Sequence, residues 1–180
     1  IMGAGIAGLG FEKLVYGGLT KVFAGIVIAP IGGIIFGLLV TTLIITLFAS
    51  RKPGPVNKTF GRLQIISSAW FALTHGANDG QKTMGIIVLI LFSAGLIPDL
   101  EMPLWVIFAA ATAMGLGTFF GGYKVIKTLG VKITKLKPYQ GFAAETSGGL
   151  MLAVFAVFGI PASTTHAITG TIMGSGAARR

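Results

Sequence analysis

The chain has 180 residues, of which 53% are hydrophobic and only 11% are charged, and its formal net charge is +9. Soluble domains carry about 25% charged residues, so this composition predicts an integral membrane protein. The lack of cysteine excludes disulfides and thiolate metal sites. Basic residues gathered in short loops beside apolar stretches indicate membrane topology and not nucleic-acid binding.

The start of the chain is predicted to be the end of a preceding repeat. Residues 1–7 and 172–178 agree at five of seven positions, which indicates an internal duplication of the kind found in transporters. A chance match between two stretches rich in Gly and Ala is the alternative. On the first interpretation, residues 1–21 hold the tail of that repeat and a connecting or interfacial segment. Residues 22–180 then form the C-terminal transmembrane repeat.

Apolar stretches predict the membrane spans. Residues 22–50 and 104–122 are apolar and long enough to cross a hydrocarbon core of roughly 30 Å. Residues 63–97 are also long enough, but polar residues and glycines predict a helix that is broken near residues 76–81. A broken helix is tolerated at membrane depth only where its backbone faces a cavity or other protein.

Loop charges predict the orientation of the chain. Residues 51–58 and 123–140 are rich in Lys and Arg, whereas residues 98–103 are acidic. The positive-inside rule places the two basic loops in the cytoplasm and the acidic loop outside. A polybasic loop also suits contact with anionic lipid head groups. We therefore expect a multi-pass protein of the cell membrane, in contact with membrane lipid.

Residues 141–178 are predicted to form a re-entrant helical hairpin. The final stretch, 167–178, is too short to span the bilayer, and the polar segment 161–166 interrupts the apolar sequence before it. Basic residues flank both ends of the region, which places both ends in the cytoplasm. The alternative is a full crossing by residues 141–159. The predicted fold is thus an all-α, polytopic bundle that forms one unit of an inverted-repeat transporter.

Two groups of polar residues are expected to meet at membrane depth. Polar and ionisable side chains are costly there and usually line a pathway or bind a ligand. The candidate residues all carry hydrogen-bonding or charged side chains: Asn78, Asp79, Lys82, Ser163, Thr164 and Thr165.

The chemistry of these groups favours an oxyanion that moves together with a cation. Pro161 and Ser163 are typical of a helix start, and a helix N-terminus attracts anions. A partly protonated phosphate is able to donate a hydrogen bond to Asp79, whereas sulfate at neutral pH is not. The set therefore favours phosphate over sulfate.

The segments HGANDGQKTMG (75–85) and GIPASTTH (159–166) resemble the paired signatures of the inorganic phosphate transporter (PiT) family, in the same order and with similar spacing. The resemblance extends over essentially the whole chain, as the C-terminal repeat. It implies a secondary transporter with two inverted repeats that takes up phosphate with sodium ions or protons. It also implies that Asn78 and Asp79 bind phosphate and cation, and that residues 163–165 close the site.

These expectations define a ligand set and a partner. Lys82 joins the phosphate ligands, and the coupling cation is assigned to Asp79, Asn78 and Thr165. No metal site and no cofactor besides H+ or Na+ is predicted. The segment 80–82 departs from the sodium-coupled pattern of the family and favours protons. The other repeat is absent from the chain, so we expect the missing N-terminal repeat or another chain as partner.

Several alternatives remain open. Asp79 and Lys82 are three residues apart and suit mutual neutralisation on one helix face. A packing role for His75, an interfacial role for Glu145 and a structural role for His166 are open, as is a purely capping role for residues 163–165. The alternative functions are a passive anion channel and a non-transporting subunit or remnant. An enzyme is disfavoured, because the sequence lacks a nucleophile–base pair, a metal cluster and a nucleotide-phosphate loop.

Overall fold

The computed structural model describes residues 2–9, 16–128 and 135–178, and every regular element in these ranges is helical, as predicted. Parts of the expected connecting segment and of the second basic loop lie outside the described residues, as do Ile1 and the C-terminal arginine pair. The helices are α1 (Met2–Leu9), α2 (Tyr16–Leu47), α3 (Pro53–Ser93), α4 (Leu104–Lys127), α5 (Pro138–Val157) and α6 (Thr164–Ala177).

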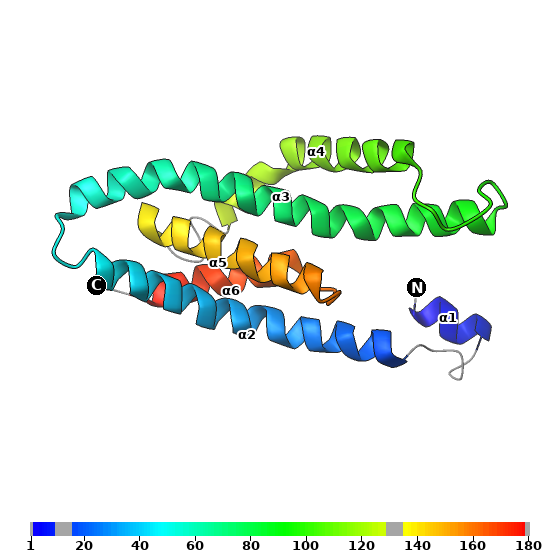
Figure 1. Cartoon of the computed structure of the whole chain (residues 1–180), viewed down its shortest axis with the longest axis horizontal. Coiled ribbons are helices and arrows are strands. Elements are labelled where there is room, and N and C mark those ends of the chain that lie inside the picture. The colour runs from blue at the N-terminus through cyan, green and yellow to red at the C-terminus, as the bar shows by residue number, and fades with distance from the viewer. Residues whose placement is uncertain (1, 10–15, 129–134, 179–180) are drawn as a thin grey trace.

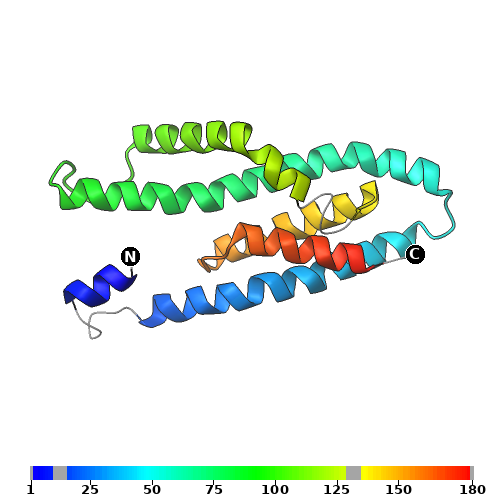
Figure 2. The same cartoon turned by 180° about the vertical axis from the view of Figure 1, so that it is seen from behind.

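A helical hairpin lies between two long helices. Helices α2 and α3 run antiparallel along the length of the molecule, and α5 and α6 fill the space between them (Figure 1). Helix α6 packs on α2, α5 packs on α3, and α4 returns beside the second half of α3. The view from behind shows the same arrangement (Figure 2). Residues 141–178, which were predicted to form a hairpin, therefore contain two packed helices, and the re-entrant course of the hairpin stays a prediction.

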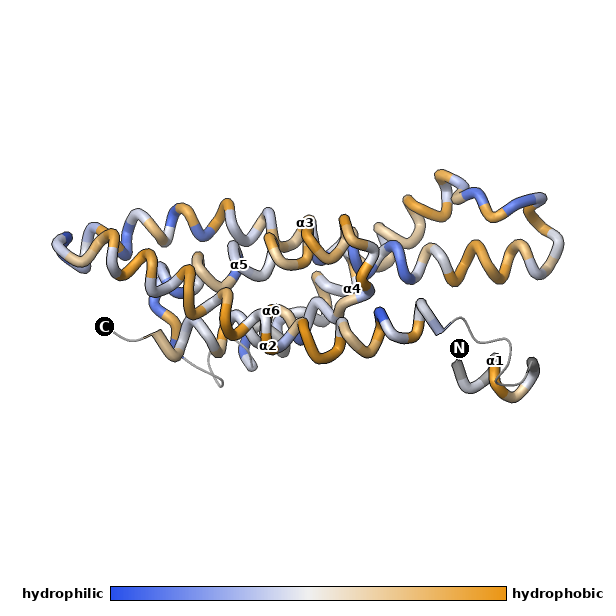
Figure 3. Tube along the Cα trace, turned by 60° about the horizontal axis from the view of Figure 1, so that its bottom comes forward, coloured by the Kyte–Doolittle hydropathy of each residue, from blue (hydrophilic) through white to orange (hydrophobic). Residues whose placement is uncertain are grey.

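Within the described residues, two helical stretches are long and apolar enough to cross a membrane. They are Tyr16–Leu47 and Leu104–Tyr123, close to the predicted spans 22–50 and 104–122. Hydrophobic residues continue along most of α2 and α4 (Figure 3), and many are exposed on the outer surface; Phe119, for example, is 81% exposed. Apolar surface of this extent is unfavourable in water but not in lipid.

The break predicted near residues 76–81 is wrong for this structure, because α3 is continuous from Pro53 to Ser93. No described residue inside α3 has a positive φ angle. Glycine in a helix costs about 1 kcal/mol relative to Ala but keeps its N–H donor, whereas proline removes it. No proline lies between Pro55 and Pro98. Helix α3 also begins inside the stretch 51–58 that was predicted to be a loop.

The turn of the hairpin has a defined local structure. Helix α5 ends at Val157 with Phe158 as its C-cap. Gly159 follows with a φ angle of 60°, and the Ile160 N–H donates to the Phe155 carbonyl at 2.9 Å. This is the Schellman motif, in which glycine adopts the left-handed conformation without steric cost. Helix α6 then starts with Ser163 as N-cap, whose Oγ accepts a hydrogen bond from the His166 N–H at 3.3 Å. The predicted helix start is confirmed.

The open end of the hairpin is held by one buried amide. Gln140 Nε2 donates to the carbonyls of Ser175 and Ala178, at 2.9 and 3.1 Å. Its Oε1 accepts from the Lys137 N–H at 2.9 Å, which also caps the start of α5. The start of α5 is therefore fixed to the end of α6.

Helices α2 and α6 approach each other backbone to backbone. A methyl group on Gly170 would lie 2.5 Å from the Pro30 carbonyl oxygen, and one on Gly37 or Gly174 would overlap the main chain of the facing helix. Small residues permit this close approach, which is a common way of packing helices in membranes. The α2–α6 pair therefore has no room for larger side chains at these positions.

Basic residues gather at the end of the bundle where α2 ends and where α3 and α5 begin (Figure 1). They include Arg51, Lys52 and Lys137. The acidic residues Asp99 and Glu101 follow the opposite end of α3. These basic and acidic residues therefore lie at opposite ends of α3, and the side of the membrane that each end faces stays a prediction.

Candidate functional site

The turn of the hairpin contacts the middle of α3. Thr164 Oγ1, in the first turn of α6, donates to Asp79 Oδ2 at 3.0 Å. Lys82 Nζ, one turn further along α3, donates to the Ala162 carbonyl at 2.9 Å. The two polar groups that the sequence predicted to meet are therefore in direct contact, although α3 presents a helix face and not a broken end.

Asp79 lies at the centre of this contact. Its Oδ1 accepts a hydrogen bond from Lys82 Nζ at 3.0 Å, and its Oδ2 lies 3.3 Å from His75 Nε2. The side chains of His75, Asp79 and Lys82 are 41%, 31% and 46% exposed. These residues share one face because a continuous helix aligns positions three and four apart. The pairing of Asp79 with Lys82 that we considered as an alternative does form, and Lys82 also reaches the hairpin.

The remaining predicted residues lie next to these in sequence but do not join the contact with Asp79. Asn78 Nδ2 donates to the Thr74 carbonyl of its own helix at 2.9 Å. Ser163 acts as the N-cap of α6, and Thr165 is exposed at the tip. The structure thus joins Asp79, Lys82 and Thr164 directly, and leaves the others beside them.

The N-terminus of α6 attracts anions, and the carboxylate of Asp79 already lies beside it. The N-terminus of α6 carries partial positive charge and N–H groups without intrahelical partners. Asp79 occupies the position facing it, with Thr164 as donor. The Lys82 ammonium balances the charge of this carboxylate. A second anion entering here therefore needs added positive charge or a shared proton.

Cation binding at this site stays a prediction. The residues predicted to bind a cation, Asp79, Asn78 and Thr165, offer a carboxylate, an amide oxygen and a hydroxyl, which suit a hard cation better than a transition metal. Within the part of the chain that the structure describes, no three His, Cys, Asp or Glu side chains group to hold a metal ion.

Sequence reasoning missed the role of Glu145. This α5 residue accepts hydrogen bonds from three side chains of α3: Ser67 Oγ at 2.5 Å, Ser68 Oγ at 2.9 Å and Gln64 Nε2 at 3.4 Å. The signal was present, because polar residues at 64, 67 and 68 form one stripe on a helix. Their common partner depends on tertiary packing. The contact of His75 with Asp79 was also missed, although their spacing of four residues indicates one helix face.

The chain is similar to known phosphate transporters over most or all of its length. Residues 49–180 match the model of a family described as the phosphate transporter family. Proteins from Rhizobium meliloti and Bacillus subtilis, each named a probable low-affinity inorganic phosphate transporter, are 46% and 41% identical over 100% of this chain. The chain spans 54% of the length of each, or about half.

A solved structure shares the fold. The structure named the sodium-dependent phosphate transporter matches with a TM-score of 0.79 at 23% sequence identity, covering 99% of this chain and 62% of that one. At this level of identity, the match establishes a common helical architecture.

Proposed function

Because the chain belongs to the phosphate transporter family, a family of transporters and not of enzymes, we propose that it forms one half of a secondary transporter. This transporter carries inorganic phosphate across the cell membrane together with a cation. The observation that carries the proposal is the hydrogen bond between Thr164 at the hairpin tip and Asp79 in α3. It joins a helix start to charged residues inside an apolar bundle, where such residues usually mark a pathway.

The half-transporter is assigned to residues 22–180 as a multi-pass transmembrane repeat, with residues 1–21 as the tail of another repeat and a connection. The partner is an N-terminal repeat or another chain, since the relatives are about twice as long. The α5–α6 hairpin is re-entrant: it enters from the cytoplasm and returns there. In support, α6 has 14 residues and is roughly 21 Å long, too short for a core of about 30 Å.

Phosphate binds between the hairpin tip and α3. The hydroxyls and the N–H groups at the start of α6 donate to its oxygens, and the Lys82 ammonium donates another hydrogen bond while it stays paired with Asp79. Asp79 accepts a hydrogen bond from a protonated phosphate oxygen, in place of the one from Thr164. The proposed ligands are all polar residues of these two segments: Asn78, Asp79, Lys82, Ser163, Thr164 and Thr165.

Coupling to a cation follows from the charge balance. The carboxylate of Asp79 and the ammonium of Lys82 cancel, so phosphate would leave an uncompensated negative charge at membrane depth, which is costly. A sodium ion or proton beside Asp79, Asn78 and Thr165 removes this charge. The requirement makes entry of phosphate depend on the cation, which is the basis of symport.

The proposal is tested in a chimera in which this chain replaces the matching part of the Rhizobium meliloti relative. Radiolabelled phosphate uptake is measured in cells with and without a cation gradient. We expect Asp79→Asn to reduce saturable uptake by about tenfold or more, because a charge-assisted hydrogen bond contributes roughly 1.5–3 kcal/mol. Asp99→Asn, the same change in an exposed loop, is the matched control and should leave uptake unchanged.

The uptake measurements distinguish coupled transport from a passive channel and from a non-transporting remnant. Accumulation of phosphate above its external concentration supports coupled transport, whereas equilibration without accumulation supports a passive channel. A chimera that inserts correctly into the membrane but takes up no phosphate indicates that this chain is a non-transporting remnant. Unchanged uptake by Asp79→Asn would remove Asp79 from the site.

A further inference from the structure

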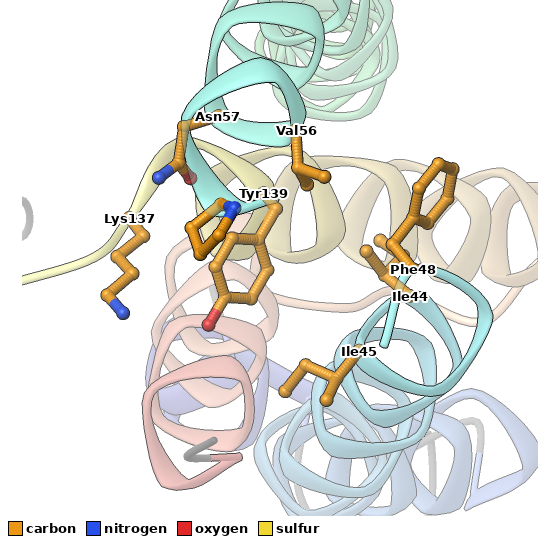
Figure 4. Close-up of a pocket in the computed structure, with 8 residues that line it drawn as sticks. Ile44, Ile45, Phe48, Val56, Asn57, Lys137 and Tyr139 are labelled. Atoms are coloured by element: carbon orange, nitrogen blue, oxygen red, sulfur yellow. The ribbon is translucent and has the colours of Figure 1, made fainter. Parts of the chain in front are cut away.

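A pocket lies at the basic end of the bundle, among the end of α2 and the starts of α3 and α5 (Figure 4). Its volume is about 60 Å³. The pocket residue Asn57 is 22 positions before Asp79 on α3, a separation of roughly 33 Å. The pocket is therefore distinct from the contact between α3 and the hairpin tip.

One wall of the pocket is apolar and firmly packed. It is formed by Ile44, Ile45, Phe48 and Val56. Ile44 is only 7% exposed, and the ring of Phe48 packs edge-on against Phe60 with centroids 5.3 Å apart. An apolar wall of this kind suits the first carbons of an acyl chain.

The opposite wall is polar and includes a hydrogen-bond acceptor that has no donor. Asn57 Oδ1 is buried and has no hydrogen-bond partner, which is costly unless a ligand or water supplies a donor. The Lys137 ammonium and the Tyr139 hydroxyl extend from the start of α5 on one side of the pocket (Figure 4). An occupant that fits this wall carries negative charge and at least one donor.

The surrounding charges select for anions. Arg51 and Lys52 precede α3, and Lys137 lines the pocket, whereas no lining residue is acidic. The starts of α3 and α5 also meet here, and each contributes the partial positive charge of a helix N-terminus. Neither N-cap lysine side chain forms a capping hydrogen bond.

We propose that this pocket binds one anionic phospholipid of the cytoplasmic leaflet whose headgroup carries a hydrogen-bond donor. The lipid phosphate lies by Lys137 and the Tyr139 hydroxyl. A headgroup hydroxyl donates to Asn57 Oδ1 once the Asn57 side chain turns toward the pocket. The upper part of one acyl chain lies on the wall formed by Phe48 and its neighbours, and the rest enters the bilayer. Positively charged residues next to membrane helices favour such lipids. This lipid site goes beyond phosphate transport and does not depend on it.

The test is native mass spectrometry of the detergent-solubilised chimera, titrated with defined lipids. Phosphatidylglycerol should be retained about tenfold more tightly than phosphatidylcholine, because one charge-assisted contact corresponds to roughly this factor. Phosphatidylmethanol, which is anionic but has no headgroup donor, should bind more weakly than phosphatidylglycerol. Asn57→Leu should abolish the difference between phosphatidylglycerol and phosphatidylmethanol. It should leave the preference for phosphatidylglycerol over phosphatidylcholine.

Matched charge changes separate a site from diffuse attraction. Lys137→Glu should lower phosphatidylglycerol binding about tenfold, whereas Lys21→Glu, the same change on an exposed position at the far end of α2, should have little effect. Equal effects of the two variants, or equal retention of phosphatidylcholine, would overturn the proposal. Displacement of the lipid by millimolar inorganic phosphate would instead assign the pocket to free phosphate. If Lys137→Glu does not fold, the Asn57→Leu comparison still decides.

Discussion

The two helices of the hairpin are held by different kinds of contact. Helix α6 meets α2 through glycines, with main chain against main chain at Gly37, Gly170 and Gly174. Helix α5 meets α3 through side chains, and glycine positions such as Gly141 face the Gln64 side chain. Glu145 adds a hydrogen-bonded carboxylate to the second interface.

The difference indicates which interface is able to adjust. Main chains in direct contact have no rotamers to change, and packed interiors resist small volume changes. Side chains and their hydrogen bonds rearrange among rotamers at modest cost. We therefore expect α2 and α6 to behave as one rigid unit, and relative movement near the candidate site to occur between the hairpin and α3.

The largest effect is expected from Gly174→Ala. The added methyl group would overlap the main chain at Ile34, so α6 has to separate from α2. A cost above the 1–3 kcal/mol typical of overpacking is expected, since backbone cannot move aside as side chains do. The free energy of unfolding of the detergent-solubilised chimera, from SDS titration, measures it.

The control for this prediction is Gly121→Ala in α4, where a methyl group meets nothing within 4 Å. This change should be neutral or stabilising by up to about 1 kcal/mol, because Ala favours helix. Equal costs for the two variants would show that the glycine contacts do not hold the α2–α6 pair.

An intermediate effect is expected from Glu145→Ala. The change removes the acceptor for Ser67, Ser68 and Gln64 and leaves polar groups between α3 and α5 unpaired. A loss of about 1–3 kcal/mol in the free energy of unfolding is expected. Glu101→Ala in the exposed loop should cost far less, and a similar cost for both would argue against the Glu145 cluster as a stabilising contact.

The smallest effect is expected from Gly141→Ala. The atoms nearest to its methyl group belong to the end of the Gln64 side chain. This side chain is able to rotate away, although its weak hydrogen bond to Glu145 at 3.4 Å is then lost. A cost of at most about 1 kcal/mol is expected, partly offset by the helix preference of Ala. A cost as large as that of Gly174→Ala would remove the distinction between the two interfaces.

Local sequence patterns predicted much of the fold. The apolar spans, the hairpin and the Ser163 cap follow from hydrophobic length and helix-start chemistry. The helix break predicted near residues 76–81 is wrong because glycines were expected to interrupt a helix as proline does. A glycine still donates its N–H to the helix, whereas proline has none. The juxtaposition of Asp79 with Thr164 was anticipated from the paired motifs, but the Glu145 cluster depends on how α5 rotates against α3, which no single segment encodes.

The central claim is that phosphate binds between the hairpin tip and the middle of α3. The most direct measurement is the rate at which a thiol reagent modifies Thr165→Cys in a chimera without other cysteines, with and without phosphate. This chain has no cysteine of its own, and Thr165 is exposed. If phosphate binds there, saturating phosphate slows the modification of Thr165→Cys. It leaves the modification of Leu96→Cys, in the exposed turn after α3, unchanged. Equal rates at Thr165→Cys with and without phosphate would contradict it.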